Sequence, residues 1–181
     1  MKARATLLGH PIHQMLIVVP LGLWVIAVVF DLITVFRPIE ELSIASFWNI
    51  VAGSAGAVLA AVFGVVDWTG IPKGTRAKRI GIFHAVTNVA VLALFVLAAV
   101  MRYDNPSYFV TTQALVVELV AFVLGGLGGW LGGELVDRLG VGVHEGAHPN
   151  ATSSLHRSAA TEPTVTTRPP MAHGASPTGA R

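Results

Sequence analysis

The fold of this chain is decided by residues 12–36, which read IHQMLIVVPLGLWVIAVVFDLITVF. This run is almost wholly apolar, and its one acidic residue is Asp31. A helix needs about 20 mainly apolar residues to cross a hydrocarbon core about 30 Å thick. Three runs of similar length follow it. We therefore expect four membrane-spanning helices, over residues 12–36, 43–66, 80–101 and 108–131.

The composition supports the same fold class. Hydrophobic residues make up 53% of the chain and charged residues 12%, whereas soluble domains contain about 25% charged residues. The absence of cysteine excludes disulfides, iron–sulfur ligation and thiolate metal sites. The small net charge of +2 argues against a nucleic-acid partner. We predict an all-α protein, a four-helix transmembrane bundle in a lipid bilayer, formed by residues 1–143.

Residues 144–181 differ in composition from the rest of the chain. They are rich in Pro, Ser, Thr, Ala and His and contain few large apolar side chains. Such a segment cannot bury enough apolar surface to offset the entropy lost on ordering. We predict a disordered tail over 144–181.

Lysine and arginine are distributed unevenly among the segments that join the four runs. The N-terminal arm and the second loop contain Lys2, Arg4, Lys73, Arg76, Lys78 and Arg79. The first and third loops contain one basic residue each, Arg37 and Arg102. Because cytoplasmic segments carry an excess of Lys and Arg, we predict that the second loop and both termini, the tail included, are cytoplasmic.

Polar side chains gather near the cytoplasmic ends of the predicted helices. This set comprises His10, His13, Asp67, His84 and Glu134. Imidazoles together with carboxylates suit a divalent metal ion, so all five are candidate metal ligands. Asn88 follows His84 by four residues and shares its helix face.

The same histidines allow two other interpretations. His13 and His84 lie at similar depth on different helices, which suits axial ligation of a haem b, with Asn88 beside the cofactor. Alternatively, the polar residues only form hydrogen bonds between helices and to interfacial water. Asp67 is also available to pair with Arg76 or Arg79.

Two acidic residues stand apart from this set. Asp31 lies near the outer end of the first helix, where we expect it to reach the interface. Glu118 lies near the middle of the fourth run, where an ionisable side chain is costly and often functional. It is either a protonated carboxyl bonded to a neighbouring helix or part of a proton or cation relay. No Ser-His-Asp order, P-loop or dinucleotide fingerprint occurs, so no catalytic residue is predicted.

Small residues recur at every fourth position in two runs. They are Gly56, Ala60 and Gly64 in the second run, and Gly125, Gly129 and Gly133 in the fourth. Such stripes allow close helix crossings in lipid. They predict tight packing within one chain or contact between two chains in a homodimer. Trp24 lies in the middle of its run and is predicted to be a packing residue.

Three stretches resemble a known family. They are GHPIHQMLIVVPLGLW (9–24), DWTGIPKGTRA (67–77), which is followed by Gly81, His84 and Asn88, and WLGGELV (130–136), which leads into GVGV (140–143). Over residues 9–143 the chain resembles the bacterial DUF2231 family of predicted four-helix membrane proteins. Similar sequences often read HPxHP where this chain has Gln14 in place of the second proline.

The resemblance implies a multi-pass protein of the bacterial inner membrane, of a family without an established activity. Relatives joined to Rieske-type iron–sulfur domains imply a redox setting. Because His10, His13, His84, Asp67 and Glu134 gather at one depth, we expect a protein that binds haem or a metal and serves a membrane redox partner. The alternatives are a non-catalytic scaffold or assembly component, and a small proton- or ion-linked transporter that uses Glu118.

Overall fold

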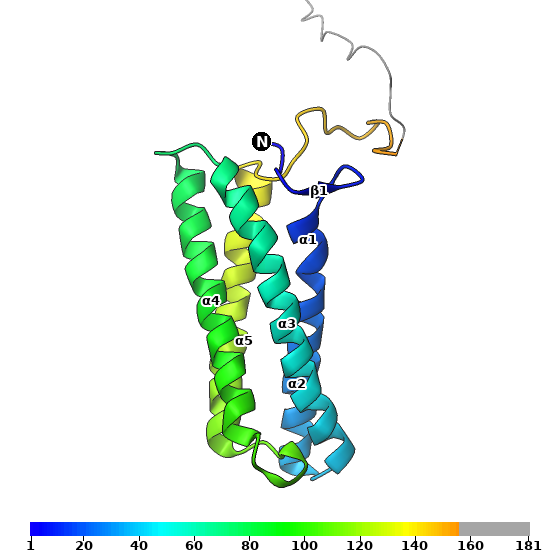
Figure 1. Ribbon diagram of the computed structural model, residues 1–181, viewed down its shortest axis with the longest axis vertical. Coiled ribbons are helices and arrows are strands. Elements are labelled where there is room, and N and C mark those ends of the chain that lie inside the picture. Colours follow the sequence, from blue (N-terminus) through cyan, green and yellow to red (C-terminus); the bar gives the residue numbers. More distant parts are fainter. Residues whose placement is uncertain (156–181) are drawn as a thin grey trace, which may run out of the picture.

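The computed structural model describes residues 1–155 and contains four long helices that run side by side in an elongated bundle (Figure 1). The elements are β1 Thr6–Leu7, β2 His10–Pro11, α1 Ile12–Leu16, α2 Val18–Phe36, α3 Glu40–Gly70, α4 Arg76–Arg102, the 3-10 turn η1 Pro106–Tyr108, α5 Thr112–Gly133 and the π-helical turn η2 Glu134–Arg138. The strands β1 and β2 pair antiparallel in a short hairpin before α1.

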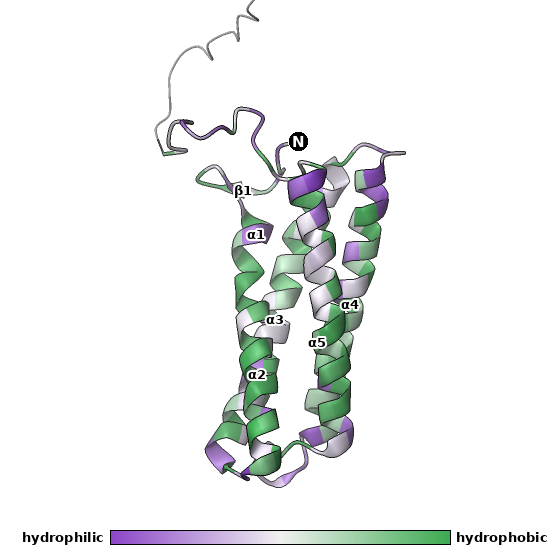
Figure 2. Cartoon of the chain, turned by 180° about the vertical axis from the view of Figure 1, so that it is seen from behind, coloured by the Kyte–Doolittle hydropathy of each residue, from purple (hydrophilic) through white to green (hydrophobic). Residues whose placement is uncertain are grey.

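Four segments are long and apolar enough to cross a membrane: Ile12–Phe36, Glu40–Gly70, Arg76–Arg102 and Pro106–Arg138. Their outward faces carry many large apolar side chains, such as Val62, Phe83 and Val123, and hydrophobic residues dominate the lengths of the helices in Figure 2. Exposing this apolar surface to water would cost free energy, whereas lipid chains are as apolar as the surface they contact. The predicted all-α, four-helix membrane bundle is confirmed.

The helix boundaries depart from the sequence prediction in all four spans, and the third, α4, begins at Arg76 rather than at Ile80. The first span is interrupted at Ile17, because Pro20 has no N–H to bond the carbonyl of Leu16. The second span is longer than expected and covers Glu40–Gly70. The helix of the fourth span begins at Thr112 rather than Tyr108, because the Thr111 hydroxyl caps it by accepting a hydrogen bond from the Ala114 N–H at 3.1 Å.

The bundle core is formed by side chains from all four spans. Trp24 of α2 stacks on Phe95 of α4 with ring centroids 4.6 Å apart, and both are almost fully buried. Trp24 is thus a packing residue, as predicted. The small side chains Ala27 and Ala121 complete the same core cluster, which lets α2 and α5 pack beside the large rings.

The bundle has two chemically different ends. One end, which we call the basic end, carries the N-terminus, the β-hairpin and the α3–α4 loop (Figure 1). The other end, which we call the opposite end, carries the α2–α3 and α4–α5 loops. Two terminal segments are joined at the basic end, where the Met1 ammonium donates to the Gly140 carbonyl at 2.8 Å. Of the predicted tail 144–181, residues 144–155 contain turns and no helix or strand, and 156–181 lie outside the described residues.

Candidate functional site

At the basic end, the first candidate residue is His13, in the short helix α1. Its Nδ1 lies 2.8 Å from the carbonyl oxygen of Ala60 on α3. The ring lies directly against Gly64, where an added Cβ would come within 2.9 Å of Nδ1. The small-residue stripe of α3 therefore makes room for an imidazole, in addition to allowing a close helix crossing.

His84 of α4 has a matching environment, formed by the neighbouring helix α5. Its Nδ1 lies 3.0 Å from the carbonyl oxygen of Gly128 on α5, and a Cβ at Gly132 would lie 3.2 Å from its Cε1. The Asn88 side chain donates to the His84 carbonyl at 2.7 Å, and its Nδ2 lies 3.5 Å from the ring Nε2. Glycines of α5 thus accommodate the second imidazole as glycine and alanine of α3 accommodate the first.

The rings of His13 and His84 lie next to each other. Their centroids are 6.2 Å apart and their planes are inclined at 83°. A carbonyl oxygen only accepts hydrogen bonds, so each Nδ1 must carry a hydrogen. In the neutral ring, each Nε2 therefore holds the lone pair through which a metal would bind, and the Nε2 of His84 has the Asn88 amide nitrogen 3.5 Å away. Both side chains are half-buried.

The other predicted metal ligands lie at the same end but are engaged elsewhere. Oδ1 of Asp67 accepts the backbone N–H groups of Arg4 and Ala5 at 2.8 and 2.9 Å, which fastens the N-terminal arm to α3. His10 is exposed, and its Nε2 lies 3.2 Å from the Ser154 hydroxyl. Within residues 1–155, no three His, Asp or Glu side chains converge as a metal site would require.

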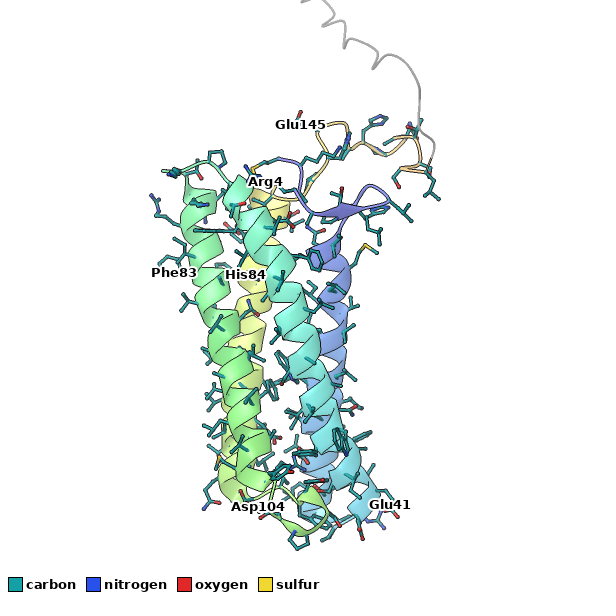
Figure 3. The ribbon with its side chains drawn as sticks, in the orientation of Figure 1. Arg4, Glu41, Phe83, His84, Asp104 and Glu145 are labelled. Atoms are coloured by element: carbon teal, nitrogen blue, oxygen red, sulfur yellow. The ribbon has the colours of Figure 1, made fainter. Side chains whose placement is uncertain are left out.

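Glu134 is paired with Arg76, whose Nη2 lies 2.6 Å from its Oε1. The pairing of Asp67 with Arg76 or Arg79 that the sequence suggested is not the one observed for Arg76. The difference arises because Arg76 begins α4 next to the end of α5, whereas Asp67 points to the N-terminal arm. In Figure 3, Arg4 lies at the basic end, at the top of the view, and His84 lies further down the bundle.

At the opposite end lies a cluster that the sequence analysis did not assemble: Arg102, Asp31 and Glu118. All three side chains are fully buried. The guanidinium of Arg102 donates two parallel hydrogen bonds to Asp31, from Nη1 to Oδ2 at 2.6 Å and from Nη2 to Oδ1 at 2.9 Å. Nη1 also lies 3.2 Å from Oε1 of Glu118. Asp31 is therefore inside the bundle and does not reach the interface as expected.

Other groups around Arg102 accept its remaining hydrogen bonds. Its Nε donates to the Tyr108 carbonyl at 2.7 Å, and its Nη2 lies 3.3 Å from the Ser43 hydroxyl. The Ser46 hydroxyl contacts Oδ2 of Asp31. Tyr108 has a positive φ of 55°, an unfavourable conformation for a bulky residue. Its ring stacks on that of Phe47 with ring centroids 4.0 Å apart. This contact and the hydrogen bond from Arg102 stabilise the conformation of the turn η1.

The sequence did contain a signal for this cluster. Asp31, Arg102 and Glu118 are ionisable residues of both signs in or next to apolar runs, and such residues normally pair with one another inside a bundle. Arg102 was instead counted as a loop residue, because it directly follows the third apolar run. The helix α4 includes Arg102 as its last residue.

The architecture, with four apolar spans joined by short polar loops, defines a multi-pass helical membrane protein. The chain belongs to the family described as "Predicted membrane protein (DUF2231)", whose model matches residues 9–145. The family resemblance seen in the sequence is thereby confirmed. No curated protein and no solved structure gave a significant match.

Proposed function

We propose that this membrane protein binds a transition metal between His13 and His84, either as a bare ion or as the iron of a haem, and serves a membrane redox system. The observation that carries the proposal is the paired setting of the two imidazoles. Each is oriented by a backbone carbonyl of a neighbouring helix, Ala60 or Gly128. Histidines that bind metals are usually oriented in this way through their second nitrogen.

The spacing of the rings supports the same proposal. A metal ion lies about 2 Å from each ligating nitrogen, and an imidazole centre lies about 1 Å beyond that nitrogen. The 6.2 Å between the ring centres of His13 and His84 is short enough for both imidazoles to reach one ion. When bound, the metal supplies one-electron chemistry. The protein supplies two neutral ligands of fixed orientation and the polar Asn88 beside one of them.

The metal content and visible spectrum of the purified full chain test this proposal. We expect a bound metal or a haem spectrum in the wild type. His13→Ala and His84→Ala should each lose most of the signal. The matched control is His10→Ala, which removes an exposed imidazole at the same end and should retain the signal. Metal analysis together with the haem spectrum distinguishes the bare ion from haem iron.

A colourless wild-type protein that contains neither iron nor copper, purified from haem-replete cells supplied with both metals, would overturn the proposal. So would equal loss of signal in the His10, His13 and His84 variants.

A second candidate function is favoured by the same hydrogen bonds. His13 joins α1 to α3, and His84 joins α4 to α5, so both imidazoles also fix helix register in a non-catalytic scaffold. Under this hypothesis His84→Leu lowers the folding yield of a protein that never contained a cofactor. An unchanged yield would count against it.

The location and partners of the protein are part of the proposal. The basic end faces the cytoplasm of a bacterial cell, and its redox partner approaches there, close to the two imidazoles. The glycines Gly126, Gly129 and Gly133 of α5 have open space around them, which leaves this face available to a second copy in a homodimer. Reporter fusions to the α3–α4 loop and to the N-terminus check the orientation, and both should report the cytoplasmic side.

A further inference from the structure

We propose that the buried cluster of Asp31, Arg102 and Glu118 is a proton-binding site that holds one exchangeable proton, with Oε2 of Glu118 as its main position. The cluster lies at the opposite end of the bundle from the two imidazoles, and the proposal does not depend on a metal.

The first step is a count of charges. Arg102 carries one positive charge, and its two bonds to Asp31, at 2.6 and 2.9 Å, neutralise one carboxylate. Glu118 has only one longer contact to the same guanidinium, at 3.2 Å. Both acids are fully buried, and an uncompensated buried charge costs several kcal/mol. A proton on the second carboxyl makes the cluster neutral.

The second step is the place for that proton. Oε2 of Glu118 is buried and has no hydrogen-bond partner among residues 1–155. A carboxylate oxygen in that position would lose its hydration without compensation. A protonated Oε2 still lacks a partner in the described part of the chain, but a neutral buried hydroxyl costs far less than an uncompensated buried charge, so a proton is favoured on this atom.

The third step concerns Ser46, which faces the cluster from α3. Its hydroxyl lies 3.2 Å from the Ala27 carbonyl and also contacts Oδ2 of Asp31. A hydroxyl has one hydrogen, so it cannot donate to both oxygens at once. Ser46 therefore adds a neutral hydroxyl to the site and no positive charge, so it does not change the charge count.

The groups around the site come from every element packed against it. Its ionisable members are Asp31 of α2, Arg102 of α4 and Glu118 of α5. The neutral groups are the Ser43 and Ser46 hydroxyls of α3 and the Tyr108 carbonyl of η1. The reaction is simple proton binding: hydronium transfers a proton to the carboxylate and leaves water. The cluster lies next to the α4–α5 connection through the bond from Arg102 to the Tyr108 carbonyl, so we expect the proton to exchange on that side of the membrane.

Infrared spectroscopy of the purified full chain near neutral pH tests the proposal. A protonated carboxyl has a C=O stretching band that a carboxylate lacks, and exchange into D₂O shifts it. We expect this band in the wild type. It should disappear in Glu118→Gln and also in Asp31→Asn, because either variant leaves one carboxylate for one guanidinium. Glu40→Gln, which removes an exposed acid at the start of α3, is the matched control and should retain the band.

A third variant should change the intensity of the carboxyl band in the opposite direction. Arg102→Met should show a stronger band than the wild type, because both carboxyls then lack a cation. Absence of the band in the wild type would overturn the proposal, and so would its persistence in Asp31→Asn, because the charge count would then be wrong. Metal content and visible spectrum should be unchanged in Glu118→Gln, which separates this test from that of the imidazole site.

Discussion

Replacing Arg102 by methionine should destabilise the bundle by about 3–5 kcal/mol, the usual penalty for removing one partner of a buried ion pair. The structure explains why the whole of this loss in unfolding free energy is expected. Arg102 is fully buried, holds Asp31 at 2.6 Å, and satisfies the Tyr108 carbonyl at 2.7 Å. Methionine fills much of the same volume, so the loss measures electrostatics and hydrogen bonding more than packing. It corresponds to an unfolding equilibrium shifted about 100-fold to several-thousand-fold.

The measurement is reversible unfolding in mixed micelles, followed by circular dichroism. Arg37→Met is the matched control, because Arg37 is an exposed arginine at the same end of the bundle, and its effect should stay within about 0.5 kcal/mol. Arg102→Lys should fall between the two, because lysine keeps the charge but cannot reproduce the two parallel bonds to Asp31.

A mutant cycle makes the test specific. In a background that contains both Asp31→Asn and Glu118→Gln, Arg102→Met should cost clearly less than in the wild type, because no carboxylate is then left without its cation. The reasoning is refuted if Arg102→Met unfolds like Arg37→Met, or if its effect is the same in that background as in the wild type.

Two further predictions concern packing and capping, and the same unfolding assay measures both. Gly53→Ala should destabilise the protein by about 1–3 kcal/mol, because the new Cβ would lie 2.8 Å from the pyrrole edge of the buried Trp24; Gly129→Ala, which has open space, should stay within about 0.5 kcal/mol. Thr111→Ala should cost about 1 kcal/mol through loss of the α5 cap, whereas Thr112→Ala, one residue later and exposed, should cost little. Equal effects within either pair would contradict the structural explanation.

The polar residues differ in how far the sequence predicted their surroundings. The common depth of His13 and His84 was predictable, because helix length and rise fix how far each residue lies from the end of its span. Their orientation was not, because it depends on which carbonyls the neighbouring helices present. The glycines beside them were predicted as a packing stripe, and only the structure shows that Gly64 and Gly132 face the two imidazoles.

The acidic residues illustrate the same limit. Glu118 was predicted to lie inside the membrane and to bond a neighbouring helix or take part in a relay, but its contact with Arg102 was not predicted. Asp31 and Arg102 were both assigned to the surface at the end of a run. Asp31 lies between one and two turns before the end of α2, and Arg102 is the last residue of α4. Whether such a side chain points to headgroups or into the bundle depends on helix rotation, which hydrophobicity alone does not specify.

The sequence by itself determined the number of spans, their order and the gathering of basic residues at alternate loops, because these follow from local hydrophobicity and from the length that a bilayer demands. The tertiary structure alone decided which side chains meet. Partners such as Arg102 and Asp31 are far apart in the chain, and their contact depends on how each helix is rotated and tilted against its neighbours. Rotation is set by side-chain packing summed over the whole bundle, and no single run of residues contains that information.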